Sequence, residues 1–199
     1  MKEEEIKSLY TDFAPKYDKY ALNKGKYIVH KELGGELASK LRRNSKVLDL
    51  GCGTGLSSTE LFKIDCEVTG IDLSKEMLEE AKKLPFKRLI CQNIEEPLNV
   101  KEDYFDGVIM LGTTEFVQKP ELLFKEINKK LKKDGLLAVT FPKKNKRIEG
   151  DSKRYSKSEV EKLISKTGFE VVSSREVFGY VRRDGEEEVI YYCYILKKL

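Results

Sequence analysis

The sequence contains only one histidine, His30, and four cysteines, and these small numbers restrict its chemistry. A single histidine excludes a metal centre built from several histidines and acid–base catalysis by a pair of them. No two cysteines have the C-x-x-C spacing of zinc or redox motifs, so neither a zinc site nor a disulfide framework is expected. The sequence therefore predicts a protein without a bound metal.

Long apolar segments are absent as well. No window approaches the roughly 18 apolar residues that a membrane-spanning helix needs. The N-terminal residues MKEEEIKSLY are too polar for the apolar region of a secretory signal. These absences favour a cytoplasmic location and no membrane partner.

Neither sign of charge is in marked excess. Lys and Arg number 38 and Asp and Glu 34, they are interspersed, and the formal net charge is +4. This pattern is typical of a solvated surface rather than a nucleic-acid-binding face. Two denser basic stretches, residues 129–133 and 143–147, leave a nucleic-acid partner open without favouring one.

With 199 residues the chain has the length of one domain, and its pattern predicts an α/β fold. From residue 45 onward, short apolar runs alternate with charged segments of helical period, which is typical of βαβ units and a parallel sheet. The expected strands cover residues 46–50, 66–71, 87–91, 104–111 and 136–141. The expected helices cover residues 57–62, 74–84, 120–131 and 156–166, and the last opens with a capping box of Ser156 and Glu159.

The last part of the chain changes character. We expect Asp134 and Gly135 to end the third helix and to turn the chain into the fifth strand. Residues 169–180 and 187–196 are β-rich runs joined around residues 183–185, Arg-Asp-Gly, which is a hairpin signal. An antiparallel pair is therefore expected to close an otherwise parallel sheet.

Residues 1–44 precede this pattern and are rich in tyrosine. Residues 27–41 have a helical pattern, and Tyr10, Tyr17, Tyr20 and Tyr27 lie before it or at its start. Such aromatic side chains serve either to staple a helix onto a sheet or to line a lid. The sequence leaves both roles open.

The strongest functional signal is the glycine-rich turn of residues 51–55, Gly-Cys-Gly-Thr-Gly, directly after the first predicted strand. Glycine lets the backbone turn sharply and lets a ligand lie against the main chain, because no Cβ intervenes. The spacing is G-x-G-x-G, whereas the dinucleotide fingerprint is G-x-G-x-x-G, and Leu56 stands at its sixth position. This spacing disfavours a pyrophosphate-binding loop.

Polar side chains follow the next two predicted strands. Asp72 lies about 20 residues past the glycine turn, where a carboxylate can accept hydrogen bonds from both hydroxyls of a ribose. Asn93 follows the third strand, at the height expected for an adenine edge if the ribose lies on Asp72. Its amide can both donate and accept hydrogen bonds.

On these motifs, residues 45–199 resemble the class I S-adenosylmethionine-dependent methyltransferases. The resemblance implies a doubly wound, Rossmann-like sheet of seven strands, mostly parallel with an antiparallel C-terminal strand, and a helical lid formed by residues 1–44. It also implies S-adenosylmethionine as cofactor and S-adenosylhomocysteine as product. The cofactor-binding residues that it implies are Tyr17, Asp49, Gly51, Cys52, Gly53, Gly55, Asp72, Leu73, Met77, Asn93, Ile94, Leu111, Gly112 and Thr113.

The resemblance also assigns roles to these residues. The glycine turn and Asp49 would contact the methionyl part of the cofactor. Leu73 and Met77 would wall the adenosine, and residues 111–113 would lie beneath the transferred methyl group. Tyr17 resembles a tyrosine that borders the cofactor and helps to close the site.

The chain departs from the family pattern at several positions. Asn93 stands where the family often has aspartate, and the neighbouring Ile94 would pack on the base. Lys133 and Asp134 stand where Pro-Gly is common before the fifth strand, which affects turn geometry more than function. Cys52, although inside the glycine turn, is interpreted as a packing residue rather than a nucleophile.

The resemblance implies methyl transfer by direct displacement, with a small molecule as the favoured acceptor. A sulfonium is already activated, so transfer requires alignment, exclusion of water and a neutral or deprotonated nucleophile, and no catalytic triad. No catalytic residue is assigned, and the candidates on the acceptor side are Tyr10, His30 and Glu115. The alternatives are an RNA methyltransferase, an NAD(P)-dependent oxidoreductase, and a protein that binds the cofactor without transferring its methyl group.

Overall fold

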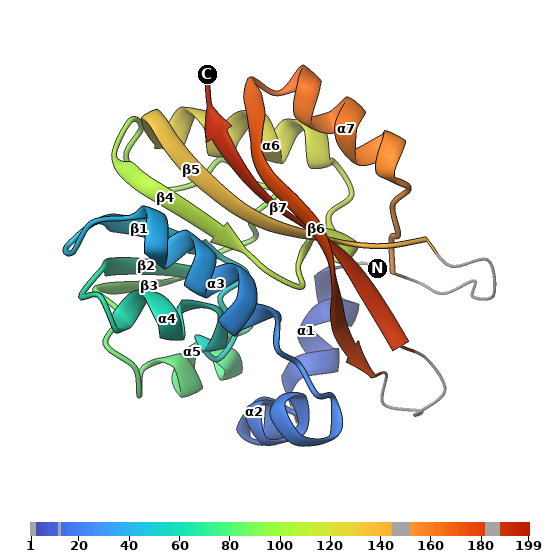
Figure 1. Cartoon of the computed structure of the whole chain (residues 1–199). Helices are drawn as coiled ribbons and strands as arrows, with labels where there is room; N and C mark the ends of the chain where they lie inside the picture. The colour runs from blue at the N-terminus through green and yellow to red at the C-terminus, as the bar shows by residue number, and fades with distance from the viewer. Residues whose placement is uncertain (1–2, 12, 145–151, 182–187) are drawn as a thin grey trace.

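A seven-stranded sheet, in the order β3-β2-β1-β4-β5-β7-β6, runs through the computed structural model, which describes residues 3–11, 13–144, 152–181 and 188–199 (Figure 1). Strands β1 to β5 run parallel, whereas β7 pairs antiparallel with both β5 and β6. The predicted sheet is therefore confirmed, while the expected turn at residues 183–185 lies outside the described residues. The strands are β1 (Lys46–Leu50), β2 (Glu67–Asp72), β3 (Arg88–Cys91), β4 (Phe105–Met110), β5 (Leu131–Pro142), β6 (Phe169–Val181) and β7 (Glu188–Lys198).

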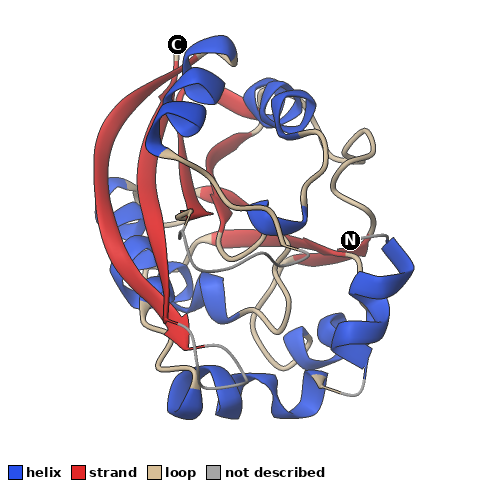
Figure 2. Cartoon of the chain, turned by 90° about the vertical axis from the view of Figure 1, so that its right-hand side faces the viewer, coloured by secondary structure: helices blue, strands red, loops and turns tan. Residues whose placement is uncertain are grey.

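Helices cover both faces of this sheet (Figure 2). Helices α3 (Val29–Lys40) and α4 (Thr59–Phe62) pack together on one face. Helices α6 (Pro120–Lys130) and α7 (Lys157–Lys166) pack together on the other. Helix α5 (Lys75–Ala81) follows β2 and contacts β2 and β3. The doubly wound arrangement expected from the sequence is present.

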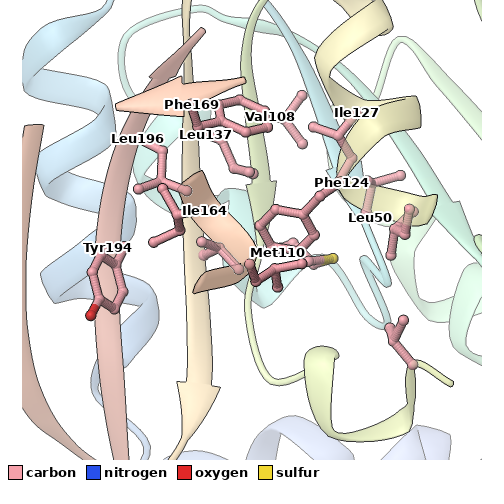
Figure 3. Packing of buried hydrophobic residues seen from close by; sticks show 14 of the residues in the cluster. Leu50, Val108, Met110, Phe124, Ile127, Leu137, Ile164, Phe169, Tyr194 and Leu196 are labelled. Carbon is pink, nitrogen blue, oxygen red and sulfur yellow. The ribbon is translucent and has the colours of Figure 1, made fainter. Parts of the chain in front are cut away.

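The central strand β1 has apolar side chains on both of its faces. Leu48 and Leu50 belong to the core on the side of α6 and α7, part of which is drawn in Figure 3. Val47, on the opposite side of the strand, packs with Leu33 and Leu37 of α3. Successive side chains of a strand point to opposite faces, so a strand covered on both faces needs apolar residues throughout. Asp49 interrupts this run.

Two helix starts follow the predicted capping chemistry. The Ser74 hydroxyl accepts a hydrogen bond from the backbone N–H of Met77 at 3.2 Å, at the start of α5. Ser156 and Glu159 form the reciprocal capping box at the start of α7. Both arrangements satisfy N–H groups that the first helical turn leaves without a partner.

The boundary between α6 and β5 differs from the prediction. Helix α6 ends at Lys130, and β5 already begins at Leu131, which pairs with Phe105. The next pairing joins Leu136 to Gly107, so the register shifts between these positions. Asp134 has a φ of 60° there, so the expected Asp-Gly turn lies inside β5 instead of at the end of the helix.

The helix expected over residues 57–62 also differs, because its first turn is tighter than an α-helix. It begins as the 3₁₀ helix η3 (Leu56–Ser58) and continues as α4 for one turn. Gly55, the residue before η3, has a left-handed φ of 94°. The chain therefore leaves the glycine turn in a conformation that favours glycine and enters the helix through a tight turn.

The N-terminal segment lies across the carboxyl end of the sheet. It consists of α1 (Glu3–Thr11), η1 (Ala14–Lys16), α2 (Tyr17–Lys19) and the π-helical η2 (Tyr20–Lys24). Figure 1 shows α1 and α2 below the sheet, near the lower ends of β6 and β7.

Two hydrogen bonds join this segment to distant parts of the chain. The Thr54 hydroxyl, in the glycine turn, donates to Asp18 Oδ1 at 2.6 Å. The backbone N–H of Val181, at the end of β6, donates to the Gly25 carbonyl at 3.0 Å. In the part of the chain that the structure describes, no helix has the length and apolar character needed to cross a membrane.

Candidate functional site

A pocket of about 940 Å³ opens at the carboxyl ends of β1 to β4 and is bordered by the N-terminal segment. In open α/β sheets, ligands bind at this edge, where the loops that follow the strands converge. Most of the residues predicted to bind a ligand line this pocket: Tyr10, Tyr17, Gly51, Gly53, Asp72, Leu73, Met77, Asn93, Ile94, Leu111, Gly112 and Thr113.

The glycine turn exposes bare main chain to the pocket. Gly51 and Gly53 have φ values of 71° and 52°, which L side chains rarely adopt. A Cβ on Gly51 would lie 2.5 Å from Thr113 Oγ1, and one on Gly53 would lie 3.2 Å from Met77 Cε. A side chain at Gly51 would therefore collide with Thr113, whereas one at Gly53 would require the end of Met77 to shift slightly.

The Asp72 carboxylate is held at the pocket by two backbone hydrogen bonds. Oδ2 accepts from the N–H of Gly53 at 2.8 Å, and Oδ1 accepts from the N–H of Ser74 at 2.9 Å. Burial raises the pKa of Asp72, and these hydrogen bonds act against that rise. A carboxylate has about four acceptor positions, so capacity remains on both oxygens for the hydroxyls of a ligand.

The amide of Asn93 is partly engaged within its own loop. Its Oδ1 accepts a hydrogen bond from the N–H of Glu95 at 2.9 Å, which orients the side chain after β3. Ile94 and Leu73 line the pocket beside it. This part of the wall combines apolar surface with one oriented amide, an arrangement that suits a heteroaromatic ring.

Three predicted contacts lie beneath the pocket rather than in its wall. Asp49 is completely buried, and the hydroxyls of Ser57 and Ser58 both donate to its Oδ2 at 2.6 Å. Cys52 is buried under the turn. A Cβ on Gly55 would lie 2.7 Å from atoms of Leu84 and Phe86. These residues shape the turn from behind.

The acceptor-side candidates are divided between the pocket and the interior. Tyr10 lines the pocket, whereas His30 and Glu115 are buried behind it. The imidazole of His30 stacks on Tyr27 with a centroid distance of 5.5 Å, and burial lowers its pKa. Glu115 Oε1 accepts a hydrogen bond from the Tyr191 hydroxyl at 2.8 Å, and burial raises the pKa of this carboxyl.

Several lining residues were not predicted from the sequence. Phe116, Val117 and Gln118, which come shortly after β4, could have been found by extending the site past the end of that strand. Glu5 and Lys7 could not, because only the tertiary position of α1 brings them to the pocket. The lining residues that the sequence did not reveal are Glu5, Lys7, Ser74, Gln92, Glu95, Phe116, Val117 and Gln118.

Within the described ranges, no group of three or more histidine, cysteine, aspartate or glutamate side chains is placed to hold a metal ion.

Comparison with known proteins relates this site to a family. The family model described as a methyltransferase domain matches residues 48–139. An uncharacterized protein of Methanocaldococcus jannaschii is 35% identical over 136 residues, which are 68% of this chain and 51% of that protein. A ubiquinone biosynthesis O-methyltransferase of Pelagibacter ubique is 33% identical over 105 residues, 51% of this chain and 44% of that protein. This chain thus spans about half the length of these curated relatives.

A solved structure shares the fold. It is that of an S-adenosylmethionine-dependent methyltransferase of Methanosarcina mazei, which superposes with a TM-score of 0.71 at 20% identity. The superposition covers 82% of this chain and 97% of that chain.

Proposed function

We propose that this chain, which belongs to the class I S-adenosylmethionine-dependent methyltransferases, binds S-adenosylmethionine in the pocket and transfers its methyl group to a small-molecule acceptor. The observation that carries the proposal is the junction of the glycine turn and Asp72. Both lie at one edge of the sheet, and Gly53 donates directly to the Asp72 carboxylate. A turn that lines the pocket with glycines, next to an oriented carboxylate, fits a ligand with a ribose and an extended polar chain.

Each part of the cofactor has a counterpart in the wall. Asp72 would accept hydrogen bonds from the ribose hydroxyls, and the backbone of Gly51 and Gly53 would lie against the methionyl chain. Leu73 and Met77 would flank the adenosine. When bound, S-adenosylmethionine supplies a methyl group that is already activated. The residues of the chain then have to orient the acceptor and exclude water.

The pocket wall continues past these residues, which supports a small acceptor. Tyr10, Phe116, Val117 and Gln118 line the same pocket and have no part in the assigned cofactor contacts. The volume of about 940 Å³ lies near the upper end of the range for pockets that bury small ligands. We assign this part of the wall to the acceptor, with Tyr10 and Tyr17 closing the pocket from the N-terminal side.

The ion pairs formed by lysines of the two basic stretches, residues 129–133 and 143–147, favour a small acceptor over RNA. Lys143 and Lys144 lie 2.8 and 2.7 Å from the carboxylates of Glu176 and Glu159. Ion pairs with neighbouring carboxylates likewise engage lysines of the other stretch, namely Lys129, Lys130 and Lys132. Lysines paired in this way release fewer counterions from a phosphate backbone, so they contribute less to nucleic-acid affinity. Residues 145–147 of the second stretch lie outside the described residues.

The assignment of Asp72 can be tested by calorimetric titration with S-adenosylhomocysteine. Asp72→Ala should weaken binding at least about tenfold, because the ribose hydroxyls lose a charged acceptor worth roughly 1.5 to 3 kcal/mol. Glu79→Ala is the matched control, since its exposed carboxylate pairs with Lys82, the residue that follows α5. Unchanged affinity in Asp72→Ala would refute the ribose assignment.

A further inference from the structure

A buried carboxylate surrounded by tyrosines lies next to the pocket and takes no part in the proposed cofactor contacts. Glu115 is 5% exposed and Tyr191 is 1% exposed, and their side chains share a hydrogen bond of 2.8 Å. Burial raises the pKa values of Tyr10, Tyr27 and Tyr191, and the negative charge of Glu115 adds to each rise. We call Glu115, Tyr10, Tyr27 and Tyr191 the tyrosine cluster.

One oxygen of this carboxylate lacks a partner. Glu115 Oε2 is buried and makes no hydrogen bond, and the same holds for Nδ1 of His30, which stacks on Tyr27. Among the described residues, no lysine or arginine forms a salt bridge with Glu115, and the charge of Arg154 acts to lower its pKa. A buried carboxylate oxygen without a hydrogen bond is costly, so the site is suited to a donor that arrives with a ligand.

The cluster is separated from the pocket by a single layer of wall. Glu115 lies in η4 (Thr114–Phe116), and both Thr113 and Phe116 line the pocket. A Cβ placed on Gly112, another lining residue, would lie 3.6 Å from the Tyr191 hydroxyl. Tyr10 belongs both to the cluster and to the pocket wall. The carboxylate therefore lies behind the segment that the resemblance places beneath the methyl group.

We propose that the tyrosine cluster receives the acceptor and selects a small molecule that presents a protonated amine. This inference rests on the proposed methyltransferase function and adds the chemical class of the acceptor. A carboxylate among aromatic rings attracts an ammonium group through charge and through the faces of the rings. A neutral hydroxyl gains less from the same site, and an anionic group is repelled.

The carboxylate would also prepare the amine for reaction. An ammonium nitrogen has no lone pair and cannot attack carbon until it loses a proton. Oε2 of Glu115 is the acceptor for that proton, so the pair becomes a neutral amine and a protonated carboxyl. Because Oε2 is enclosed, part of the wall between the cluster and the pocket has to move to admit the amine.

The test uses three probes that share one skeleton, titrated into the protein saturated with S-adenosylhomocysteine. Phenethylamine carries the ammonium group, phenethyl alcohol is neutral, and hydrocinnamate is anionic. We expect phenethylamine to bind at least about tenfold more tightly than either of the others. Equal affinities, or no binding of the amine, would overturn the proposal. Absence of S-adenosylhomocysteine binding would instead contradict the proposed function itself.

Glu115→Gln should abolish the preference for the amine, because it removes the charge and keeps the shape. Retained binding of S-adenosylhomocysteine shows that this variant is folded. Glu121→Gln, which alters an exposed helix ion pair with Lys125, should keep the preference. A full preference in Glu115→Gln would overturn the proposal.

A second variant, Tyr191→Phe, tests the pair without removing the carboxylate. The Tyr191 hydrogen bond lowers the pKa of Glu115 against the effect of burial, so its loss should raise that pKa further. On acidification, the variant should therefore lose its preference for the amine at a higher pH than the wild type. The charged and titratable groups around Glu115 are Tyr10 of α1, Tyr27 before α3, Arg154 and Tyr155 before α7, and Tyr191 of β7. An unchanged pH dependence would contradict the role of Glu115.

Discussion

Asp49 shows how burial changes the chemistry of a single residue. Its carboxylate is completely buried, two serine hydroxyls donate to Oδ2, and Oδ1 has no partner among the described residues. Burial raises the pKa of Asp49 from 3.8 to about 7, although the serine hydrogen bonds oppose the rise. Near neutral pH, this side chain therefore gains or loses a proton easily.

The raised pKa predicts a pH-dependent stability. The folded state holds the proton of Asp49 more tightly than the unfolded state, so the free energy of unfolding should fall as pH rises from 3.8 to about 7. The contribution of Asp49 to this slope reaches at most about 1.4 kcal/mol per pH unit. Asp49→Asn should reduce the slope in urea denaturation, whereas the exposed Asp65→Asn should not. A wild-type slope in Asp49→Asn would contradict the assigned pKa.

Alanine substitutions of a glycine in the turn and of a glycine in α3 should have opposite effects on stability. Gly51→Ala should destabilise the protein by about 1 to 3 kcal/mol, because its φ is 71° and its Cβ would lie 2.5 Å from Thr113 Oγ1. Gly35→Ala, within α3 and with open space around its Cβ, should stabilise by about 0.5 to 1 kcal/mol. Thermal unfolding measures both, and equal effects would argue against a constrained turn.

At the scale of elements, the N-terminal segment is expected to act on the pocket rather than on the core. Deletion of residues 1–20 removes Tyr10 and Tyr17 from the pocket wall and the hydrogen bond between Asp18 and Thr54. We expect the truncated chain to keep its cooperative unfolding and to bind S-adenosylhomocysteine more weakly. If the truncated chain bound S-adenosylhomocysteine with wild-type affinity, this segment would serve for packing and not for binding.

The inner strands of the sheet could be predicted because they are covered on both faces. Strands β1, β4 and β5 carry the apolar runs that the covering helices require, and the connections that contain α4, α5 and α6 match βαβ units. The early start of β5 at Leu131 could not be predicted, since it depends on pairing with Phe105 across a register shift. The turn-forming residues Asp134 and Gly135 indicated that the helix ends there, but the pairing of Leu131 with Phe105 makes β5 begin earlier.

The candidate site was predictable where it follows strand ends. Asp72 ends β2 and Asn93 follows β3, and neighbouring parallel strands bring such positions to one edge. Gly55, the last residue of the turn, faces Leu84 and Phe86 instead of the pocket, and these two residues are distant from it in sequence. The same applies to Glu5 and Lys7, whose approach to the pocket depends on how α1 folds back.

At the scale of the whole molecule, the basic residues are balanced by nearby carboxylates. Surface ion pairs such as Lys125 with Glu121 and Lys82 with Glu79 contribute little to stability individually. They do neutralise much of the positive charge that a nucleic acid would need. A single domain and a cytoplasmic location remain predictions from the sequence.

The central claim, a pocket for S-adenosylmethionine, is tested most directly by calorimetric titration of the whole protein with S-adenosylhomocysteine, NAD and NADP in separate experiments. The pocket geometry predicts saturable binding of S-adenosylhomocysteine and none of the two nicotinamide cofactors. Binding of NAD or NADP without binding of S-adenosylhomocysteine would contradict the claim and support the alternative of an NAD(P)-dependent oxidoreductase.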